Sequence, residues 1–167
     1  MEQAQKICIE MLEQRGCTIQ EVQETKIFGQ DPDGSKLCVF FIHNQFGTDS
    51  MKNILGLLNK LDTKHVLVLL QNSITNQAKT SIAELKHINF ETFFVKELQV
   101  NITKHRLQPK SFEKLSKEEA NIFTRKYGRK IPRMRSTDTI AKFYNYRSGD
   151  IIKVERLNDH ITYRIII

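Results

Sequence analysis

The strongest constraint on the fold of this 167-residue chain is a pair of nearly continuous apolar segments, Leu37–Ile42 and Val66–Leu70. A strand that is apolar at every position has both of its faces covered, as in a sheet with helices on each side. Between the two segments, apolar residues recur on one face of a helix. They are Met51, Ile54, Leu55, Leu58 and Leu61. The pattern predicts two buried strands joined by a helix, and both runs fall short of the ~20 residues of a bilayer span.

The same alternation continues on both sides of this central unit. An amphipathic helix is expected over Gln3–Arg15, and a weakly alternating extended segment follows at Cys17–Val22. Thr75 or Asn76 can cap a third helix, and Phe90–Val95 is a third strand candidate. This order of helices and strands is typical of an α/β layer, in which helices pack on a sheet.

The composition of the sequence changes near residue 100, where the chain becomes polar and basic. Ser116 and Glu119 form a capping box, which opens a helix that ends at Gly128. Asp138 or Thr137 can cap a second helix, Thr139–Tyr146. A short extended segment, Ile131–Met134, is expected between these two helices.

Two strands are expected at the end of the chain, after a turn at Gly149. They cover Asp150–Leu157 and His160–Ile167, and a tight hairpin at Asn158-Asp159 joins them. Alternation in the second strand predicts which residues face the core. They are Ile161, Tyr163 and Ile165.

These patterns predict an α+β chain with two domains, an α/β domain over residues 1–98 and a smaller α+β domain over residues 99–167. The net charge of +7 is unevenly divided between them. Residues 1–100 carry 10 basic and 12 acidic side chains, whereas residues 101–167 carry 16 basic and 7 acidic ones. The positive excess in the second segment predicts an acidic partner, most commonly nucleic acid.

The cysteines and histidines give no sign of a metal or redox site. Cys8, Cys17 and Cys38 include no C-x-x-C pair, and an odd, scattered set predicts reduced thiols in an intracellular protein. Cys8 and Cys38 are interpreted as small buried apolar residues. The histidines stand far apart in sequence, so no zinc site, cofactor or catalytic residue is expected.

One pattern resembles the PD…(D/E)xK arrangement of metal-dependent nucleases, namely Pro32-Asp33 followed by Asp62-Thr63-Lys64. In such sites two carboxylates hold Mg²⁺ and a lysine positions the attacking water. Glu24-Thr25-Lys26 and Glu84-Leu85-Lys86 match the same loose pattern, and Asp62 falls at the end of a helix rather than on a strand. We therefore interpret Asp33 as part of a turn and Asp62 as a helix C-terminus.

The segment Arg125–Arg135 holds six basic residues and no acid. Arg125 and Lys126 suit the C-terminal end of a helix, where cations interact favourably with the helix dipole. For the rest of the segment two interpretations stay open. It forms either a solvated face or a contact with nucleic acid or an acidic protein.

A series of motifs in the second half of the chain matches a known family. They are Asn101-Ile102-Thr103-x-His105-x-Leu107-x-Pro109-Lys110, Ile131-Pro132-Arg133-Met134, Asp138, Ala141-x-Phe143-Tyr144, Arg147-Ser148-Gly149-Asp150-Ile151-Ile152-Lys153-Val154-x-Arg156 and Thr162-Tyr163-Arg164. This series resembles the assembly domain of the fifth subunit of eukaryotic RNA polymerases, a domain that by itself constitutes a small subunit of the archaeal RNA polymerase. Arg15-Gly16 and Gln71-Asn72-x-Ile74-Thr75-x-x-Ala78 are similar to the N-terminal jaw domain of that family.

The resemblance implies a non-catalytic subunit of a DNA-directed RNA polymerase. Residues 1–98 would form the jaw domain, with a restriction-endonuclease-like fold that lacks an active site and lies beside downstream duplex DNA. Thr75 would be the residue nearest the DNA, and Lys79 is added on charge alone as a weak phosphate contact. Residues 99–167 would form the assembly domain, which docks on the largest polymerase subunit. The docking residues that we select are Ile131, Pro132, Arg133, Lys153, Arg156, Tyr163 and Arg164.

The alternative hypothesis is a free nucleic-acid-binding protein or a diverged PD-(D/E)xK nuclease. The family's Asp-Pro and Thr-Pro are replaced here by Asp138-Thr139 and Thr75-Asn76, and the jaw domain is trimmed. Such divergence suits a large DNA virus as well as a cellular eukaryote. A cellular subunit is expected in the nucleus and a viral one in a cytoplasmic viral factory or the virion, in neither case with a membrane partner.

Overall fold

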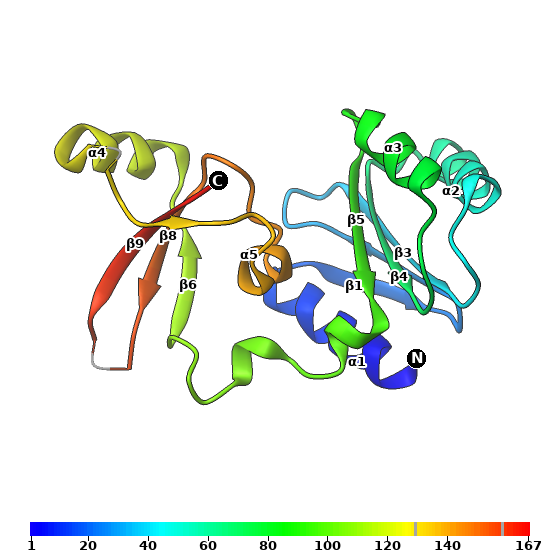
Figure 1. The fold of residues 1–167 in the computed structure, drawn as a ribbon, viewed down its shortest axis with the longest axis horizontal. Helices are drawn as coiled ribbons and strands as arrows, with labels where there is room; N and C mark the ends of the chain where they lie inside the picture. The colour runs from blue at the N-terminus through cyan, green and yellow to red at the C-terminus, as the bar shows by residue number, and fades with distance from the viewer. Residues whose placement is uncertain (129, 158) are drawn as a thin grey trace. The chain divides into compact units, whose positions relative to one another are not determined.

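A computed structural model describes residues 1–128, 130–157 and 159–167 and divides into two units, residues 1–100 and 101–167 (Figure 1). The predicted boundary lies two residues earlier. The first unit contains α1 (Glu2–Gln14), β1 (Thr18–Val22), β2 (Lys26–Gln30), β3 (Lys36–Ile42), α2 (Thr48–Leu61), β4 (His65–Leu70), α3 (Asn76–Glu84), β5 (Asn89–Phe94) and the 3-10 turn η1 (Val95–Leu98). The second contains the 3-10 turn η2 (Ile102–Lys104), β6 (Ser111–Lys114), α4 (Lys117–Tyr127), β7 (Arg133–Met134), α5 (Thr139–Phe143), β8 (Ile151–Glu155) and β9 (Ile161–Ile166).

The first unit is built on a five-stranded sheet in the order β1-β2-β3-β4-β5. β3, β4 and β5 are parallel and are connected by α2 and α3, so the predicted strand–helix–strand core is confirmed. β1, β2 and β3 form an antiparallel extension. The sequence pattern missed β2 (Lys26–Gln30), because it contains Gly29, a residue type that is rare in strands. Here β1 passes so close that a Cβ at Gly29 would lie 2.6 Å from the carbonyl oxygen of Thr18.

Both faces of the first sheet are covered, as the continuous apolar runs require. One face packs against α2 and α3. Its core consists of Cys38, Phe40, Val66, Val68 and Leu70 from the sheet with Met51, Ile54, Leu58 and Ala78 from the helices. The opposite face of the sheet is formed by the alternate strand residues, and these are also buried: Leu37, Val39, Leu67 and Leu69. α1 covers this opposite face with its own buried side chains, on the side of the sheet away from α2 and α3 (Figure 1).

The second unit has a four-stranded sheet in the order β6-β8-β9-β7. β6, β8 and β9 are antiparallel, and β7 runs parallel to β9, so both sheets of this α+β chain are mixed. β6 was not predicted, because Phe112 is its only apolar residue. The predicted hairpin falls partly outside the described residues, since Asn158 is not among them.

The helix predicted over Thr139–Tyr146 is shorter than expected and ends at Phe143. Asn145 adopts a left-handed conformation with φ of 54°, and the amide of Tyr146 donates back to the carbonyl of Ala141 at 2.8 Å. Asparagine tolerates this conformation at a helix end. The helix therefore stops three residues early because the chain turns at Asn145.

The expected core face of the last strand is wrong. The core of the second unit comprises Met134, Ala141, Ile152, Val154 and Ile166. In β9, Thr162 and Arg164 lie opposite Val154 and Ile152, so they share the core face with Ile166. Tyr163 lies on the other face and contacts Phe123 of α4 with ring centroids 4.4 Å apart. Three successive isoleucines end the chain, so alternation alone could not decide between the two phases.

Local signals at the helix ends of the second unit have the geometry that the sequence predicted. The Ser116 hydroxyl accepts from the amide of Glu119 at 3.2 Å, and the Glu119 carboxylate accepts from the amide of Ser116 at 2.8 Å. Asp138 accepts from the amide of Ile140 at 2.9 Å, and Gly149 turns with φ of 93°. No helix in the described ranges has the length and apolar character needed to cross a bilayer.

Candidate functional site

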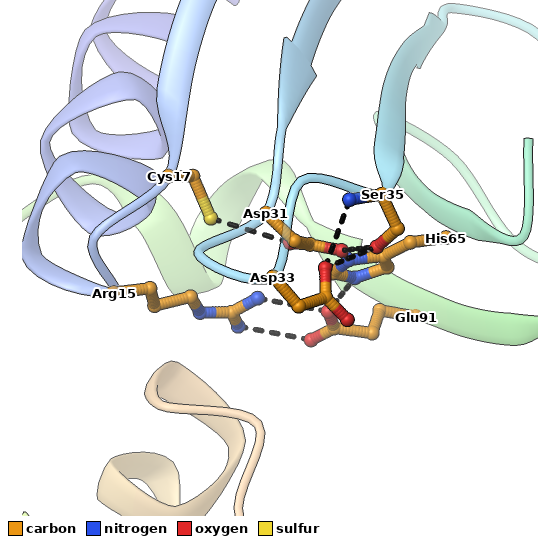
Figure 2. Close-up of polar contacts among 7 residues, drawn as sticks. All are labelled: Arg15, Cys17, Asp31, Asp33, Ser35, His65 and Glu91. Atoms are coloured by element: carbon orange, nitrogen blue, oxygen red, sulfur yellow. Dashed lines mark hydrogen bonds and ion pairs between the residues drawn. The ribbon is translucent and has the colours of Figure 1, made fainter.

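Four charged side chains meet at the edge of the first sheet where β4 begins (Figure 2). Arg15 follows α1, Asp31 follows β2, His65 opens β4, and Glu91 lies within β5. We call these four residues the ionic cluster. Their side chains are only 6%, 17%, 7% and 9% exposed, respectively, so the cluster is shielded from water.

The geometry of the cluster joins each cation to a carboxylate. The two terminal nitrogens of Arg15 donate to the two carboxylate oxygens of Glu91 at 2.8 and 2.9 Å. His65 donates from Nδ1 to Asp31 and from Nε2 to Glu91, both at 2.7 Å. An ionised carboxylate only accepts, so both ring nitrogens of His65 must carry protons. Two cations therefore balance two anions.

The pKa values of the cluster follow from this pairing. Burial by itself lowers the pKa of His65, but the hydrogen bonds to Asp31 and Glu91 outweigh burial and raise it above its ordinary value. Burial raises the pKa of Glu91, but His65 and Arg15 outweigh it and hold that pKa below its usual range. The pKa of Asp31 is lowered in the same way, mainly by His65 against the effect of burial. The pairing thus favours the charged forms of all three groups.

The thiols near the cluster are inert. Cys17 donates from Sγ to Asp31 at 3.4 Å (Figure 2), and burial, followed by the nearby Asp31 charge, raises its pKa to about 12. Burial likewise raises the pKa of Cys8 to about 12. Nucleophilic cysteines have lowered pKa values and exposed sulfur atoms. Cys8, Cys17 and Cys38 are free and buried, which agrees with the predicted structural role of Cys8 and Cys38.

The buried and mutually paired side chains of the ionic cluster form a structural network. It lies at the amino end of β4, whereas ligands of open α/β sheets bind beyond the carboxyl ends of the strands. No group of three or more His, Cys, Asp or Glu side chains in the described part of the chain could hold a metal ion.

The two aspartates of the nuclease-like pattern lie in different settings. Asp33 is exposed, and its carboxylate accepts from the hydroxyl of Ser35 at 2.6 Å in the turn after β2 (Figure 2). Asp62 ends α2 in a left-handed conformation with φ of 50°. The interpretation of these residues as a turn and a helix C-terminus is therefore confirmed.

The loops at the carboxyl edge of the parallel strands lie together and hold Thr75. The amide of Thr75 donates to the carbonyl of Phe46 at 3.0 Å, and its hydroxyl accepts from the amide of Ala78 at 3.2 Å as the cap of α3. Asn72 donates to the carbonyl of His43 at 2.7 Å, which further ties the loop after β4 to the loop after β3. Lys79 lies one turn into α3 and is exposed. The two predicted DNA-proximal residues thus share one helix end.

The predicted docking residues of the second unit are divided between the two faces of its sheet. Lys153 lies opposite Tyr163 on the face that carries α4. This α4 surface, formed by Ile122, Phe123, Tyr127, Lys153 and Tyr163, lines a shallow cavity of about 350 Å³. Ile122 and Tyr127 are 65% and 59% exposed, and no described residue of α4 is buried.

Two of the three docking arginines, Arg156 and Arg164, lie on the face that carries α5. Arg156 and Arg164 line a cavity of about 250 Å³ together with apolar residues of the core face. Arg164 is on that face because it pairs with Ile152 in the register of β8 and β9. The structure therefore brings Arg156 and Arg164 together but separates them from Lys153 and Tyr163 by the thickness of the sheet.

Ile131, Pro132 and Arg133 lie at the edge of the second sheet. The carbonyl of Pro132 accepts from the amide of Ile165 at 2.9 Å, and Arg133 pairs with Ile165 in β7. Pro132 and Arg133 are exposed, and Ile131 is half-buried. Proline at such an edge removes a donor that a further strand would need.

Sequence reasoning missed the ionic cluster as a set. Glu91 stands inside an apolar strand and His65 opens a fully buried one, and a charged residue at such a position needs a partner. That signal was present, but it could not identify the partners. Arg15 and Asp31 come from distant parts of the chain, and the sequence marks Arg15 only as part of a motif.

Comparison with known proteins places these features in a family. Residues 100–166 match the family model described as RNA polymerase Rpb5, C-terminal domain. The DNA-directed RNA polymerases I, II, and III subunit rpabc1 of Dictyostelium discoideum is 30% identical, over 82% of this chain and 74% of its own length. The DNA-directed RNA polymerase V subunit 5A of Arabidopsis thaliana is 28% identical, over 84% of this chain and 72% of its own length.

A viral relative is also found. The 454R protein of Invertebrate iridescent virus 6, an inferred DNA-directed RNA polymerase subunit, is 40% identical over 113 residues. This match spans 60% of the present chain and 60% of the viral protein. Cellular and viral relatives are thus both described as RNA polymerase subunits. The Dictyostelium relative and the match to the Rpb5 C-terminal domain show that this chain belongs to the family of RNA polymerase subunit 5.

Proposed function

We propose that the chain is a non-catalytic subunit of a DNA-directed RNA polymerase, whose second unit docks on the largest polymerase subunit and whose first unit lies near downstream DNA. The observation that carries the proposal is similarity along most of the chain. The Dictyostelium relative matches 82% of it, and the family model covers residues 100–166. The names of these relatives describe them as subunits of multisubunit polymerases.

Docking through the second unit is supported by apolar and charged side chains that are exposed on its surface. α4 contributes exposed Ile122 and Tyr127, and aromatic side chains of this kind are enriched at the centres of protein interfaces. Arg156 and Arg164 add positive charge on the opposite face. The seven docking residues proposed from the sequence therefore form two faces and an edge strand rather than a single patch.

A position near downstream DNA is proposed for Thr75 and Lys79. Both belong to the first turns of α3, at the edge of the sheet where ligands of α/β folds bind. The first unit carries a net charge of −2, so its own attraction for phosphates is weak. The DNA contact would be nonspecific and would depend on where the assembled polymerase holds this unit.

The inactive, restriction-endonuclease-like character of the first unit is part of the same proposal. Its support is the separate environments of Asp33 and Asp62 and the neutralised carboxylates of the ionic cluster. An active nuclease of this class needs carboxylates free to hold Mg²⁺. The location would follow the polymerase, in the nucleus of a cell or in the factory or virion of a large DNA virus.

The alternative is a free nucleic-acid-binding protein, which the net charge of +9 on residues 101–167 favours. The two proposals differ in what the isolated chain does. A free binder holds DNA at submicromolar concentration with strong salt dependence, whereas a polymerase subunit binds DNA weakly when alone. Mg²⁺-dependent cleavage that is lost in Asp33→Ala and Asp62→Ala variants would instead support the diverged nuclease.

The decisive experiment is gentle affinity purification of the tagged chain from its host, followed by mass spectrometry. We expect the largest polymerase subunit among the recovered proteins, and its absence would overturn the proposal. A double variant, Arg156→Glu with Arg164→Glu, should remain folded but fail to recover the polymerase. Normal recovery with this variant would show that the docking residues are assigned wrongly.

A further inference from the structure

The cavity on the α5 face of the second unit combines an apolar wall with two arginines. Its apolar lining includes Phe112, Met134 and Val154, and its charged lining includes Arg156 and Arg164. The volume of about 250 Å³ is below the roughly 300–1,000 Å³ of a drug-sized ligand site. It suits one or two amino-acid side chains.

Both arginines lack a partner within the ranges that the structure describes. Neither guanidinium makes an ion pair or hydrogen bond there, although Arg164 is half-buried in β9. Lysines of the same unit are paired, as in Lys114 with Asp150 at 2.9 Å and Lys153 with Glu113 at 3.2 Å. A guanidinium offers a planar fork of donors that fits a carboxylate with two parallel hydrogen bonds.

The polar groups that the structure describes near the cavity do not accept hydrogen bonds from the guanidinium groups of Arg156 and Arg164. Asp138 also lines the cavity, but its carboxylate accepts from the amide of Ile140 at 2.9 Å and caps α5. Thr162 lies two residues before Arg164 on the same face of β9, opposite Val154. Within the described ranges its hydroxyl is buried without a hydrogen-bond partner, which is costly in a finished structure. Thr162 does not line the cavity, so Arg164 is the polar residue of this face of β9 that an incoming residue can reach there.

We infer that this cavity receives an acidic side chain, Asp or Glu, flanked by apolar residues in a segment of another polymerase subunit. The carboxylate binds Arg156 and Arg164, and the apolar neighbours contact Phe112, Met134 and Val154. The inference rests on the proposed function, because it assumes docking through the second unit. It adds the chemistry of the partner segment and assigns it to the α5 face.

A polypeptide fits this cavity better than nucleic acid does. A nucleic-acid backbone carries a phosphate at every step and gains little from an apolar wall. The Asp138 carboxylate in the lining also disfavours a chain of closely spaced negative charges. A single carboxylate between apolar side chains complements both the positive charge of the arginines and the apolar lining of the cavity.

The test uses the full chain in its host, with charge-neutral and charge-conserving variants. Arg164→Gln and Arg156→Gln should each lower recovery of the largest polymerase subunit at least about tenfold, because each removes one of the two arginines that bind the partner's carboxylate. Arg164→Lys should give an intermediate recovery, since lysine keeps the charge but loses the fork. Arg106→Gln, an exposed arginine outside the cavity, is the matched control and should change nothing. Full recovery with both glutamine variants would overturn the inference.

A cross-linking arm keeps the test valid even if a variant folds poorly. Gln108 lines the cavity, and its replacement by p-benzoylphenylalanine places a photoreactive group there while both arginines remain. The expected product is a polymerase peptide with Asp or Glu beside apolar residues. A cross-linked peptide without an acid, a cross-link to nucleic acid, or no cross-link overturns the inference while the docking proposal stands. If no polymerase subunit is recovered at all, both fail.

Discussion

The two units of this protein treat charge in opposite ways. The first unit encloses two cations and two anions in the ionic cluster, where each is less than one-fifth exposed. The second unit keeps its ion pairs on the surface, where the Lys110 side chain is 57% exposed beside Glu155, and it leaves Arg156 and Arg164 without partners in the described chain. Buried charges act on the stability of their own unit, whereas unpaired surface charges are available to another molecule.

The largest expected effect comes from removing one charge of the buried ionic cluster. Glu91→Gln leaves Arg15 buried without its carboxylate, so the free energy of unfolding of the first unit should fall by about 3–5 kcal/mol. Hydrogen exchange of the full chain, followed peptide by peptide, measures this loss separately in each unit.

The matched control is Glu113→Gln, which removes the exposed partner of Lys153. It should leave protection of the second unit nearly unchanged, because exposed ion pairs contribute little. If the two substitutions had equal effects, the contrast between the units would not hold.

The next effect is a pH dependence confined to the first unit. The raised pKa of His65 means that its stabilisation is complete below its unfolded value of 6.5 and is lost as pH rises through the higher folded value. The lowered pKa values of Asp31 and Glu91 mean that their stabilisation is present above the unfolded values of 3.8 and 4.5. It is lost as pH falls through the folded values.

Stability of the first unit should therefore peak between the carboxylate and imidazole ranges. Thermal unfolding measured from pH 3 to pH 9 should show a fall on both sides of that peak. His65→Asn should remove the fall on the alkaline side. A variant whose alkaline fall persists would show that another group causes it.

A smaller effect is expected at a local feature of the second unit. Ser116→Ala removes the cap of α4 and should lower the free energy of unfolding by about 1 kcal/mol. Ser116→Asp keeps an acceptor at the same position and should restore most of the loss. No described residue of α4 is buried, so this helix should depend on its cap, whereas α2 has no side-chain cap and is held by the buried Met51, Ile54 and Leu58.

The smallest effect is expected from removing an exposed ion pair of the second unit. Lys110→Gln removes the exposed pair with Glu155, and the thermal midpoint should not change measurably. The wild-type midpoint should also be insensitive to added salt in the second unit, because screening removes only weak interactions there. A clear drop for this variant would mean that surface pairing does stabilise the second unit.

Much of the first unit was predictable because its signals are local and strong. The runs in β3 and β4, and the helix face of α2, each follow from the side-chain period of one element. β2 was not predictable, since the reason for Gly29 is the approach of β1, a contact that no local pattern records. The ionic cluster was hidden for the same reason, because its four members come from four separate elements.

In the second unit, the local sequence pattern fits two different orientations of strand β9 equally well. The sequence predicted β9 as a strand and Ser116, Glu119 and Asp138 as caps, since caps depend on residues only two or three positions apart. It gave the wrong phase for Tyr163, because the isoleucines at the end of the chain satisfy either register. Only pairing with β8 assigns Arg164 to the core face and Tyr163 to α4.

The sequence by itself thus determined most of the elements other than β2 and β6, the division near residue 100, the helix caps of the second unit and the family. These depend on short-range periodicity, capping chemistry and motif order, all of which are written along the chain. The tertiary structure alone decided which charges are enclosed and which arginines share a cavity. Those outcomes depend on strand register and on contacts between residues far apart in sequence, where a shift of one position moves a side chain to the opposite face.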